Sequence, residues 1–383
     1  MMEMKKLTDI CDIQYGYAFD SKCFTEDSSY PQLVRIRDVK KGYSETYYSG
    51  DYPKEYILTE GDLLIGMDGE FNIARWKCSG ALLNQRVCKL TAKVGTNEEY
   101  LRFAMSKSLK EIEKRTAFVT VKHLSAKELN KLELDVPELS KQDKIADTLS
   151  RLERIIEARE EELEKLDDLI KARFVEMFGS IHDGRFDMKT LLEIVNDDKN
   201  SIKRGPFGGA LKKEDFVEDG YLVYEQRHAI HNDFEYAKYY ITQEKYEGMI
   251  GFKVVPGDLI ISCSGVTLGR IAEVPEGAKE GIINQALLKL SLNPHIMMNT
   301  FFIQQFRGEE IQNILFGFSR GSGIPNMPSM SEVKAVKFIC PPLELQKEYC
   351  DFVHQVDKSK VVVQKALDET QILFNSLMQQ YFG

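Results

Sequence analysis

The stretch EGDLLIGMDGEFNIARW, at residues 60–76, has a second version in PGDLIISCSGVTLGRIA, at residues 256–272. Both place Gly-Asp-Leu before a short apolar run and follow that run with a loop that contains glycine. Short apolar runs bounded by glycine are typical of buried strands. The pair indicates that one strand-and-turn unit occurs twice in this chain.

Three further pairs of segments keep the same order along the chain. ALLNQRV (81–87) and GIINQAL (281–287) share Asn-Gln, and VPELSKQDKIADTL (136–149) matches CPPLELQKEYCDFV (340–353). The later segments RFVEMFG and QQYFG also match. The offset between matched residues grows from 196 to 204, and only between blocks, as a duplication with diverged loops would show. The less favoured explanation is that unrelated α/β segments share these short sequences by chance.

A long, charged helix is expected at the end of each copy. The apolar residues there recur at alternating intervals of four and three residues, which is the spacing of a heptad seam. Neither segment contains an internal proline or glycine that would interrupt a helix. The seam residues are Ile145, Leu149, Leu152, Ile156, Leu163, Leu166, Ile170 and Met177 in the first copy, and Tyr349, Val353, Val356, Val363, Leu367, Phe374, Leu377 and Tyr381 in the second. The seams most simply pack on each other as an intramolecular antiparallel coiled coil. Packing of each helix on its own domain, or in a homodimer, is the alternative.

These patterns predict an α+β fold with two globular domains that are related by pseudo-two-fold symmetry and separated by the antiparallel coiled coil of two long helices. A chain of 383 residues is long enough for two domains, each with its own core. We expect the first domain over residues 1–140, a long helix over 141–180, the second domain over 181–344 and another long helix over 345–383.

The composition argues against several classes of protein. The chain has 51 Lys+Arg against 60 Asp+Glu, so it is not expected to bind DNA by bulk charge alone. Its seven cysteines show no CxxC spacing, and His228 and His231 have no further ligand beside them, so we expect neither disulfides nor a metal site. Neither a signal segment nor an apolar run of membrane-spanning length is present, which predicts a cytoplasmic protein without membrane association.

The duplicated Gly-Asp-Leu strand, the duplicated Asn-Gln block and the Pro-x-Leu-x-x-Gln start of each long helix resemble the specificity subunits of type I restriction-modification systems. RGPFGGALKKEDF (204–216) looks like the glycine loop near the start of a recognition domain in that family. At the corresponding place the first copy has QYGYAFDSKCF (14–24), which retains a single glycine. The resemblance covers essentially the whole chain.

This resemblance implies a non-catalytic DNA reader. Each target-recognition domain would bind one half of a bipartite target in double-stranded DNA, and the helices would set the spacing between the halves. Two methyltransferase subunits would dock on the chain, and restriction subunits would join for cleavage. The chain itself would hold no cofactor, because S-adenosylmethionine would belong to the partner methyltransferase subunit.

The sequence contains no recognisable catalytic motif. Asn-Pro-His at 293–295 lacks the second proline and the aromatic residue of an adenine methyltransferase loop. The glycines at 205–209 have the wrong spacing for a dinucleotide or phosphate loop, and Ser264-Gly265 is not part of a GxSxG elbow. We therefore expect no catalytic residues in this chain.

DNA contacts are expected from basic residues beside loops, because arginine and lysine bind phosphates and base edges. The candidate DNA-binding residues are Arg35, Arg37, Arg75, Arg86 and Lys122 in the first copy, and Arg204, Lys212, Lys213, Arg227, Arg270 and Arg320 in the second. The Asn-Gln pairs at 84–85 and 284–285 could read adenine edges. Their place at a repeated strand start favours a structural hydrogen bond instead.

Two other functions are alternatives to the specificity subunit. A coiled-coil interaction scaffold without sequence-specific DNA binding would suit the acidic net charge of −9. An enzyme with an unfamiliar site would have to modify DNA on its own. The specificity subunit is favoured because the duplication includes both the globular parts and the helices.

Overall fold

The computed structural model describes residues 3–115, 123–317 and 325–383 and divides the chain into two compact units. Unit 1 comprises Met1–Glu161 and Gln364–Gly383, and unit 2 comprises Glu162–Val363. The long helices α4 (Leu139–Phe178) and α11 (Leu343–Phe382) each contribute one part to unit 1 and one part to unit 2.

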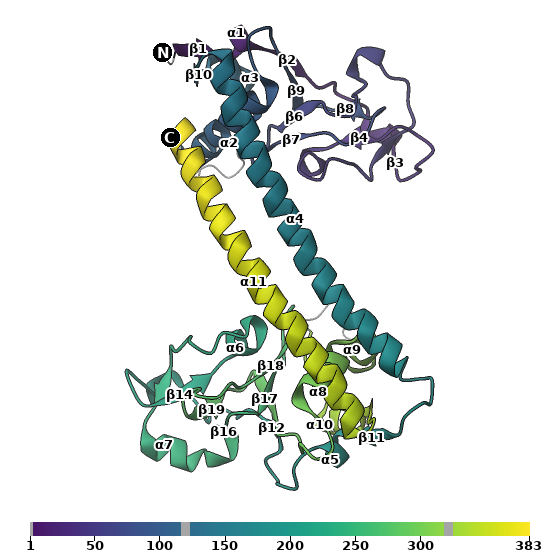
Figure 1. The fold of residues 1–383 in the computed structure, drawn as a ribbon, viewed down its shortest axis with the longest axis vertical. Coiled ribbons are helices and arrows are strands. Elements are labelled where there is room, and N and C mark those ends of the chain that lie inside the picture. Colours follow the sequence, from purple (N-terminus) through teal and green to yellow (C-terminus); the bar gives the residue numbers. More distant parts are fainter. Residues whose placement is uncertain (1–2, 116–122, 318–324) are drawn as a thin grey trace. The chain divides into compact units, whose positions relative to one another are not determined.

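Unit 1 is built on a four-stranded antiparallel sheet with the strand order β2-β9-β6-β7 (Figure 1). Apolar side chains of this sheet pack against α2. Three strand pairs complete it: β1-β10 and β3-β5 are antiparallel, and β4-β8 is parallel. Its strands are β1 (Glu3–Lys6), β2 (Cys11–Tyr15), β3 (Phe24–Thr25), β4 (Leu33–Val34), β5 (Tyr47–Tyr48), β6 (Leu63–Gly66), β7 (Ile73–Arg75), β8 (Leu82–Leu83), β9 (Val87–Ala92) and β10 (Glu133–Val136). Its shorter helices are α1 (Leu7–Ile10), η1 (Ser21–Cys23), η2 (Ile36–Asp38), η3 (Lys54–Tyr56), α2 (Glu98–Arg115) and α3 (Ala126–Lys131).

Unit 2 contains a four-stranded sheet with the order β12-β20-β17-β18, a five-stranded sheet with the order β13-β15-β14-β19-β16, and the pair β11-β21 (Figure 1). Its strands are β11 (Met188–Thr190), β12 (Ile202–Arg204), β13 (Phe216–Val217), β14 (Tyr221–Tyr224), β15 (Tyr240–Ile241), β16 (Lys253–Val254), β17 (Leu259–Ser262), β18 (Ile271–Glu273), β19 (Gly281–Ile283), β20 (Leu287–Leu290) and β21 (Lys337–Ile339). Its shorter helices are α5 (Leu191–Ile194), η4 (Lys213–Asp215), α6 (Gln226–His231), α7 (Gln243–Gly248), η5 (Ile250–Phe252), α8 (Asn299–Arg307), α9 (Glu309–Phe316) and α10 (Met330–Ala335).

The order and pairing of the elements repeat from one unit to the other. The sheet β2-β9-β6-β7 corresponds to β12-β20-β17-β18, and the parallel pair β4-β8 corresponds to β14-β19. A long helix follows the last strand in each copy. The predicted duplication and the α+β class with two globular copies and two long helices are confirmed.

The ends of the heptad seams are buried in the globular cores. In unit 2, Tyr349 and Val353 of α11 belong to the main core, together with Ile170 of α4. In unit 1, Leu149 of α4 is in the core, and Phe374 of α11 packs against it. Helix pairing and packing of each helix on a globular core, which the sequence presented as alternatives, therefore occur together.

Inside unit 2 the two long helices run antiparallel. The hydroxyl of Tyr349 donates to the carbonyl of Ile170 at 3.2 Å, and Lys360 Nζ lies 2.6 Å from Asp167 Oδ1. The residue number falls along α4 as it rises along α11, which confirms the predicted direction of the pairing.

The repeated Gly-Asp-Leu forms the same turn in both units. Gly61 and Gly257 have φ values of +93° and +84°, a conformation that favours glycine. The carboxylates of Asp62 and Asp258 each accept a hydrogen bond at 2.9 Å from the backbone N–H three residues earlier. Each also pairs with a lysine of the neighbouring strand, at 3.4 and 3.6 Å. The repeated Gly-Asp-Leu sequence therefore specifies a turn.

The glutamine near the start of each long helix ties that helix to a neighbouring loop. Gln142 and Gln346 are both buried. The amide nitrogen of Gln142 donates to the carbonyl of Pro137 at 2.8 Å, and its oxygen accepts from the backbone N–H of Asn97 at 2.9 Å. Gln346 makes the same contacts with the equivalent proline and with the N–H of Met298, both at 2.9 Å. The matched glutamines thus have one structural role.

Replacing Gln346 with alanine should loosen the start of α11. The change leaves buried backbone groups unpaired, which costs about 1–3 kcal/mol. Backbone hydrogen–deuterium exchange should accelerate at Met298 and stay unchanged at Asn97, whose acceptor is Gln142. Gln355→Ala, on the exposed face of the same helix, serves as the control. Unchanged exchange at Met298 in the Gln346 variant would contradict this role.

Candidate nucleic-acid interface

In both units the loop after the Gly-Asp-Leu strand meets a segment from further along the chain. Asp68 forms an isolated antiparallel bridge with His123 in unit 1, and Ser264 forms one with Asn326 in unit 2. The residue after the bridge donates a backbone hydrogen bond to the strand end, at 2.7 Å in unit 1 and 2.8 Å in unit 2. This place is named the bridge site; its side chains are Asp68, Arg86 and His123 in unit 1, and Arg204, Gln226, Ser264 and Asn326 in unit 2.

The bridge site of unit 1 carries charged groups. Arg86 Nε lies 3.5 Å from Asp68 Oδ2, and one terminal nitrogen of Arg86 lies 3.1 Å from His123 Nδ1. Asp68 also pairs directly with His123. About half of the Arg86 side chain, 51%, stays exposed. The guanidinium is therefore both held in place and accessible.

The bridge site of unit 2 is dominated by amides and hydroxyls. The side-chain oxygen of Asn326 accepts a hydrogen bond from Arg204 at 3.1 Å. The amide nitrogen of Gln226 donates to the hydroxyl and the carbonyl of Ser264, at 3.2 and 3.0 Å. The same backbone arrangement thus presents a different set of donors and acceptors in each unit.

The glycine at the end of the first sheet strand allows a close backbone approach. A Cβ at Gly205 would lie 1.8 Å from the carbonyl oxygen of Asn284, and one at Gly16 would lie 2.0 Å from that of Asn84. The side-chain oxygens of both asparagines accept backbone N–H bonds in the same turn, at 2.9 Å for Asn84 and 3.0 Å for Asn284. This geometry favours the structural interpretation of the Asn-Gln pairs over base reading.

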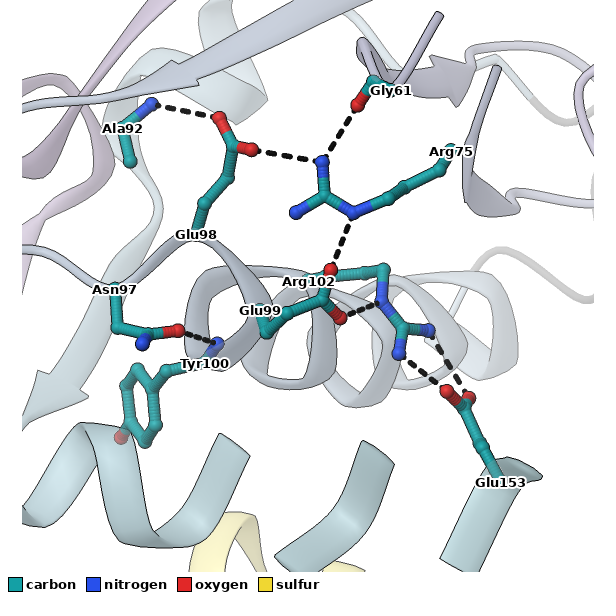
Figure 2. Close-up of polar contacts among 9 residues, drawn as sticks. All are labelled: Gly61, Arg75, Ala92, Asn97, Glu98, Glu99, Tyr100, Arg102 and Glu153. Atoms are coloured by element: carbon teal, nitrogen blue, oxygen red, sulfur yellow. Dashed lines mark hydrogen bonds and ion pairs between the residues drawn. The ribbon is translucent and has the colours of Figure 1, made fainter. Parts of the chain in front are cut away.

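Arg75 is held by backbone and carboxylate groups of its own unit. Its guanidinium donates to the carbonyl of Gly61 at 2.6 Å and to Glu98 at 2.9 Å, and it also pairs with Glu99 (Figure 2). Burial alone would lower the pKa of Arg75, but its bonds and charges with Glu99 and Glu98 raise that pKa above the ordinary value. These contacts favour a structural role for Arg75 over a DNA contact.

The network continues to the long helix. Arg102 Nε lies 2.7 Å from Glu99 Oε2, and a terminal nitrogen of Arg102 lies 3.1 Å from Glu153 on α4 (Figure 2). Burial alone would raise the pKa of Glu99, but Arg102 and Arg75 lower it below its ordinary value. Charged side chains therefore connect β7, α2 and α4 within unit 1.

Unit 2 satisfies the equivalent backbone group without an arginine. The amide nitrogen of Asn299 donates to the carbonyl of Gly257 and to Glu273, both at 2.8 Å. Glu273 has the sheet register that Arg75 has in unit 1, because each lies opposite the leucine of Gly-Asp-Leu. A cation at this register is thus a feature of one copy and serves its internal packing.

The other predicted DNA contacts are distributed over both units. Arg227 lies 3.4 Å from Asp233, and Arg204 belongs to the bridge site. Lys122 and Arg320 lie outside the described residues. The predicted residues with exposed side chains are Arg35, Arg37, Arg86, Lys212, Lys213, Arg227 and Arg270. The bridge site brings together one predicted residue in each unit, Arg86 and Arg204, with neutral and acidic side chains.

The sequence interpretation missed the bridge-site residues other than the two arginines. These are Asp68 and His123 in unit 1, and Gln226, Ser264 and Asn326 in unit 2. No motif marks them, because the two copies differ there. Position was the available signal: Asp68 and Ser264 both stand five residues after the leucine of Gly-Asp-Leu.

Metal-binding clusters and membrane-spanning helices are absent from the part of the chain that the structure describes. No group of histidine, cysteine, aspartate or glutamate that could hold a metal ion is found there, and none of its helices is both long and apolar enough to cross a membrane. All seven cysteines are unpaired. Burial raises the pKa of Cys88 and of Cys263 to about 12, which suppresses the reactive thiolate.

The chain matches a family model and a curated protein. The model described as the type I restriction modification DNA specificity domain matches residues 1–167 and 206–370. The type I restriction enzyme EcoBI specificity subunit of Escherichia coli is 38% identical over 166 residues, which are 43% of this chain and 35% of that protein. The match thus spans about a third of the length of this relative.

Two solved structures resemble the whole chain in fold. The S subunit of a type I restriction-modification system from M. genitalium gives a TM-score of 0.58 at 16% identity, over 100% of this chain and 96% of that one. A chain from a structure on complex assembly and conformational transition of the type I R-M system gives 0.55 at 16% identity, over 100% and 97%. At these identities the likeness concerns the fold alone.

Unit 1 should lose a contribution to its stability when Glu99 is protonated. Because its folded-state pKa is lowered, the charged form stabilises unit 1 above the ordinary value of 4.5, and this contribution fades as the pH falls through the lower folded value. The loss of unfolding free energy in Glu99→Gln should therefore be largest near neutral pH and shrink in acid.

Urea unfolding can be followed by the fluorescence of Trp76, which is the single tryptophan and is buried in unit 1. The titration would run from neutral pH to about pH 3. Glu157→Gln, at an exposed position of α4, is the matched control. A difference between wild type and Glu99→Gln that does not change with pH would count against this account.

Proposed function

Because the chain belongs to the type I restriction modification DNA specificity family, we propose that it selects the DNA target of a type I restriction-modification complex. Each unit binds one half of a bipartite site in double-stranded DNA. The observation that supports this most directly is the bridge site, where one backbone arrangement carries unlike polar side chains in the two units. A reader of two different half-sites needs a common frame with different groups at the base edges.

Basic residues would supply the contacts to the phosphates and base edges of DNA. The full set retained for this role is Arg35, Arg37, Arg86, Lys122, Arg204, Lys212, Lys213, Arg227, Arg270 and Arg320. Arg75 is set apart because carboxylates already occupy its guanidinium. The net charge of −9 suggests that partner subunits contribute much of the attraction to DNA.

The long helices are proposed as the docking surface for two methyltransferase subunits. Large apolar side chains that lie exposed on a surface mark sites of protein–protein interaction. The exposed apolar residues of α4 and α11 include Ile155, Ile372 and Leu373 in unit 1, and Leu169, Val361 and Val362 in unit 2. S-adenosylmethionine and the chemistry on adenine belong to the partner, and restriction subunits join for cleavage.

In functional terms we retain the division into recognition domains at 1–140 and 181–344 and spacer helices at 141–180 and 345–383. The two compact units divide within the helices instead, because each helix end is part of a globular core. In this proposal the chain performs no catalysis and acts in the cytoplasm, where its DNA substrate lies.

The test of the function is selection from a random pool of duplex DNA by the chain bound to methyltransferase subunits. Sequencing of the retained DNA should give two short conserved blocks separated by a gap of fixed length. One continuous block, or no preference, would contradict the proposal. The second outcome would favour the interaction scaffold without sequence-specific DNA binding.

The helices should act as the ruler between the two blocks. Deleting one heptad from each, at residues 157–163 and 361–367, preserves the seven-residue repeat of the seam. The helices become shorter by about 10 Å at ~1.5 Å per residue. The preferred gap should then shrink by about three base pairs at ~3.4 Å each.

The same DNA selection measures the gap for both proteins. Deletion of the heptad from α4 alone is the control, because it removes turns from one helix without the matching change in the other. A double deletion that binds DNA with the original gap would show that the helices do not set the spacing.

A further inference from the structure

We propose that Arg86, positioned by Asp68 and His123, determines specificity by selecting a guanine in the half-site bound by unit 1. This inference rests on the proposed function and adds the residue and the base. It is carried by the geometry of the bridge site, by the backbone of Arg86 and by the comparison with unit 2.

The comparison with unit 2 shows that the fold does not require an arginine at this position. In unit 1 the carbonyl of Arg86 accepts a hydrogen bond at 2.8 Å from the backbone N–H of the residue before Asp68. In unit 2 the carbonyl of Ala286 accepts the equivalent bond at 2.9 Å from the residue before Ser264. The two carbonyl groups accept equivalent hydrogen bonds, and an alanine at this position is sufficient for that role.

The backbone conformation of Arg86 indicates that its side chain has a functional role. Its φ is +71°, a conformation that residues with a side chain rarely adopt and that glycine adopts freely. Ala286 does not have a positive φ. Strained conformations of this kind are retained mainly where the residue serves a site. Glycine at position 86 would relieve the strain, and the chain has an arginine there.

The contacts of Arg86 orient its guanidinium for base recognition. Nε faces Asp68 at 3.5 Å, and one terminal nitrogen faces His123 at 3.1 Å. The remaining N–H donors of the terminal nitrogens match the geometry of guanine O6 and N7, which arginine binds with two parallel hydrogen bonds. A carboxylate in contact with the guanidinium reduces its rotational freedom, so less entropy is lost on binding.

The described residues leave space beside Asp68 at Gly69. Gly69, next to Asp68, has a φ of +72°, and a Cβ built there would meet no heavy atom of the described residues within 4 Å. Asp68 is mostly covered, with 22% of its side chain exposed, whereas Arg86 is more exposed. The arginine side chain is therefore more accessible than the carboxylate that it contacts.

The test uses the full chain with its methyltransferase subunits and the same random-pool selection of duplex DNA. In Arg86→Gln the preference for guanine should fall about tenfold or more at a single position of one block. Adenine should rise at that position, because glutamine pairs with adenine N6 and N7. The other block and the gap should be unchanged.

Asp68→Asn tests the positioning role. It should weaken the guanine preference at the same position, with a smaller change than Arg86→Gln, because the arginine remains but is held less firmly. Arg115→Gln is the matched charge control, since Arg115 is an exposed arginine of α2 in the same unit and is not a proposed DNA contact. It should leave every base preference intact. The buried Trp76 reports by fluorescence whether unit 1 remains folded in each variant.

Two outcomes would overturn the inference. An equal loss of affinity for all sequences in Arg86→Gln would identify Arg86 as a phosphate contact. Unchanged affinity and preference would identify the cluster as an internal ion pair. In both cases the wild-type complex would still select a bipartite site, so the proposed function would stand. A wild-type complex without such selection would instead contradict the proposed function itself.

Discussion

A buried glutamine side chain joins each long helix to the globular part of its copy, and the remaining architecture depends on that joint. The side chain satisfies a proline carbonyl after the preceding strand and a backbone N–H just before an earlier helix, α2 in unit 1 and α8 in unit 2. Buried backbone groups have few other partners, so the direction in which the helix leaves the strand is determined locally. Gln142 and Gln346 apply this joint twice, which explains why the two copies match so well at this point of the sequence.

The sequence segments that match between the two copies predicted the fold well because their residues have structural roles. Gly61 and Gly257 are retained for a positive φ, and the Asn-Gln pairs are retained for a turn that a glycine approaches closely. Heptad spacing likewise predicted the long helices and their pairing. The burial of the helix ends in the globular cores was only the less favoured alternative, because it depends on contacts with residues such as Phe301 and Phe103 that lie far away in sequence.

The same reasoning explains why the site was harder to predict than the fold. Residue type identified arginines and lysines as candidates, but it does not show which of them are already paired with carboxylates. Arg75 and Arg86 look alike in sequence, and the structure surrounds the first with two glutamates and leaves the second half exposed. Asp68 and Asn326 carry no motif at all. Residues that must differ between two DNA-recognition domains cannot be found by comparing the two copies for shared residues.

The division of the chain also has a consequence for its synthesis. Unit 2 is continuous in sequence, whereas unit 1 needs Gln364–Gly383 together with Met1–Glu161. Phe374, Leu377 and Tyr381 cover part of the unit 1 core. Unit 1 can therefore complete its core only after residues 364–383 have left the ribosome, so it finishes folding later than unit 2 although most of it is translated earlier. A chain that stops early would leave an apolar surface uncovered on unit 1, which is the kind of surface that chaperones and proteases bind.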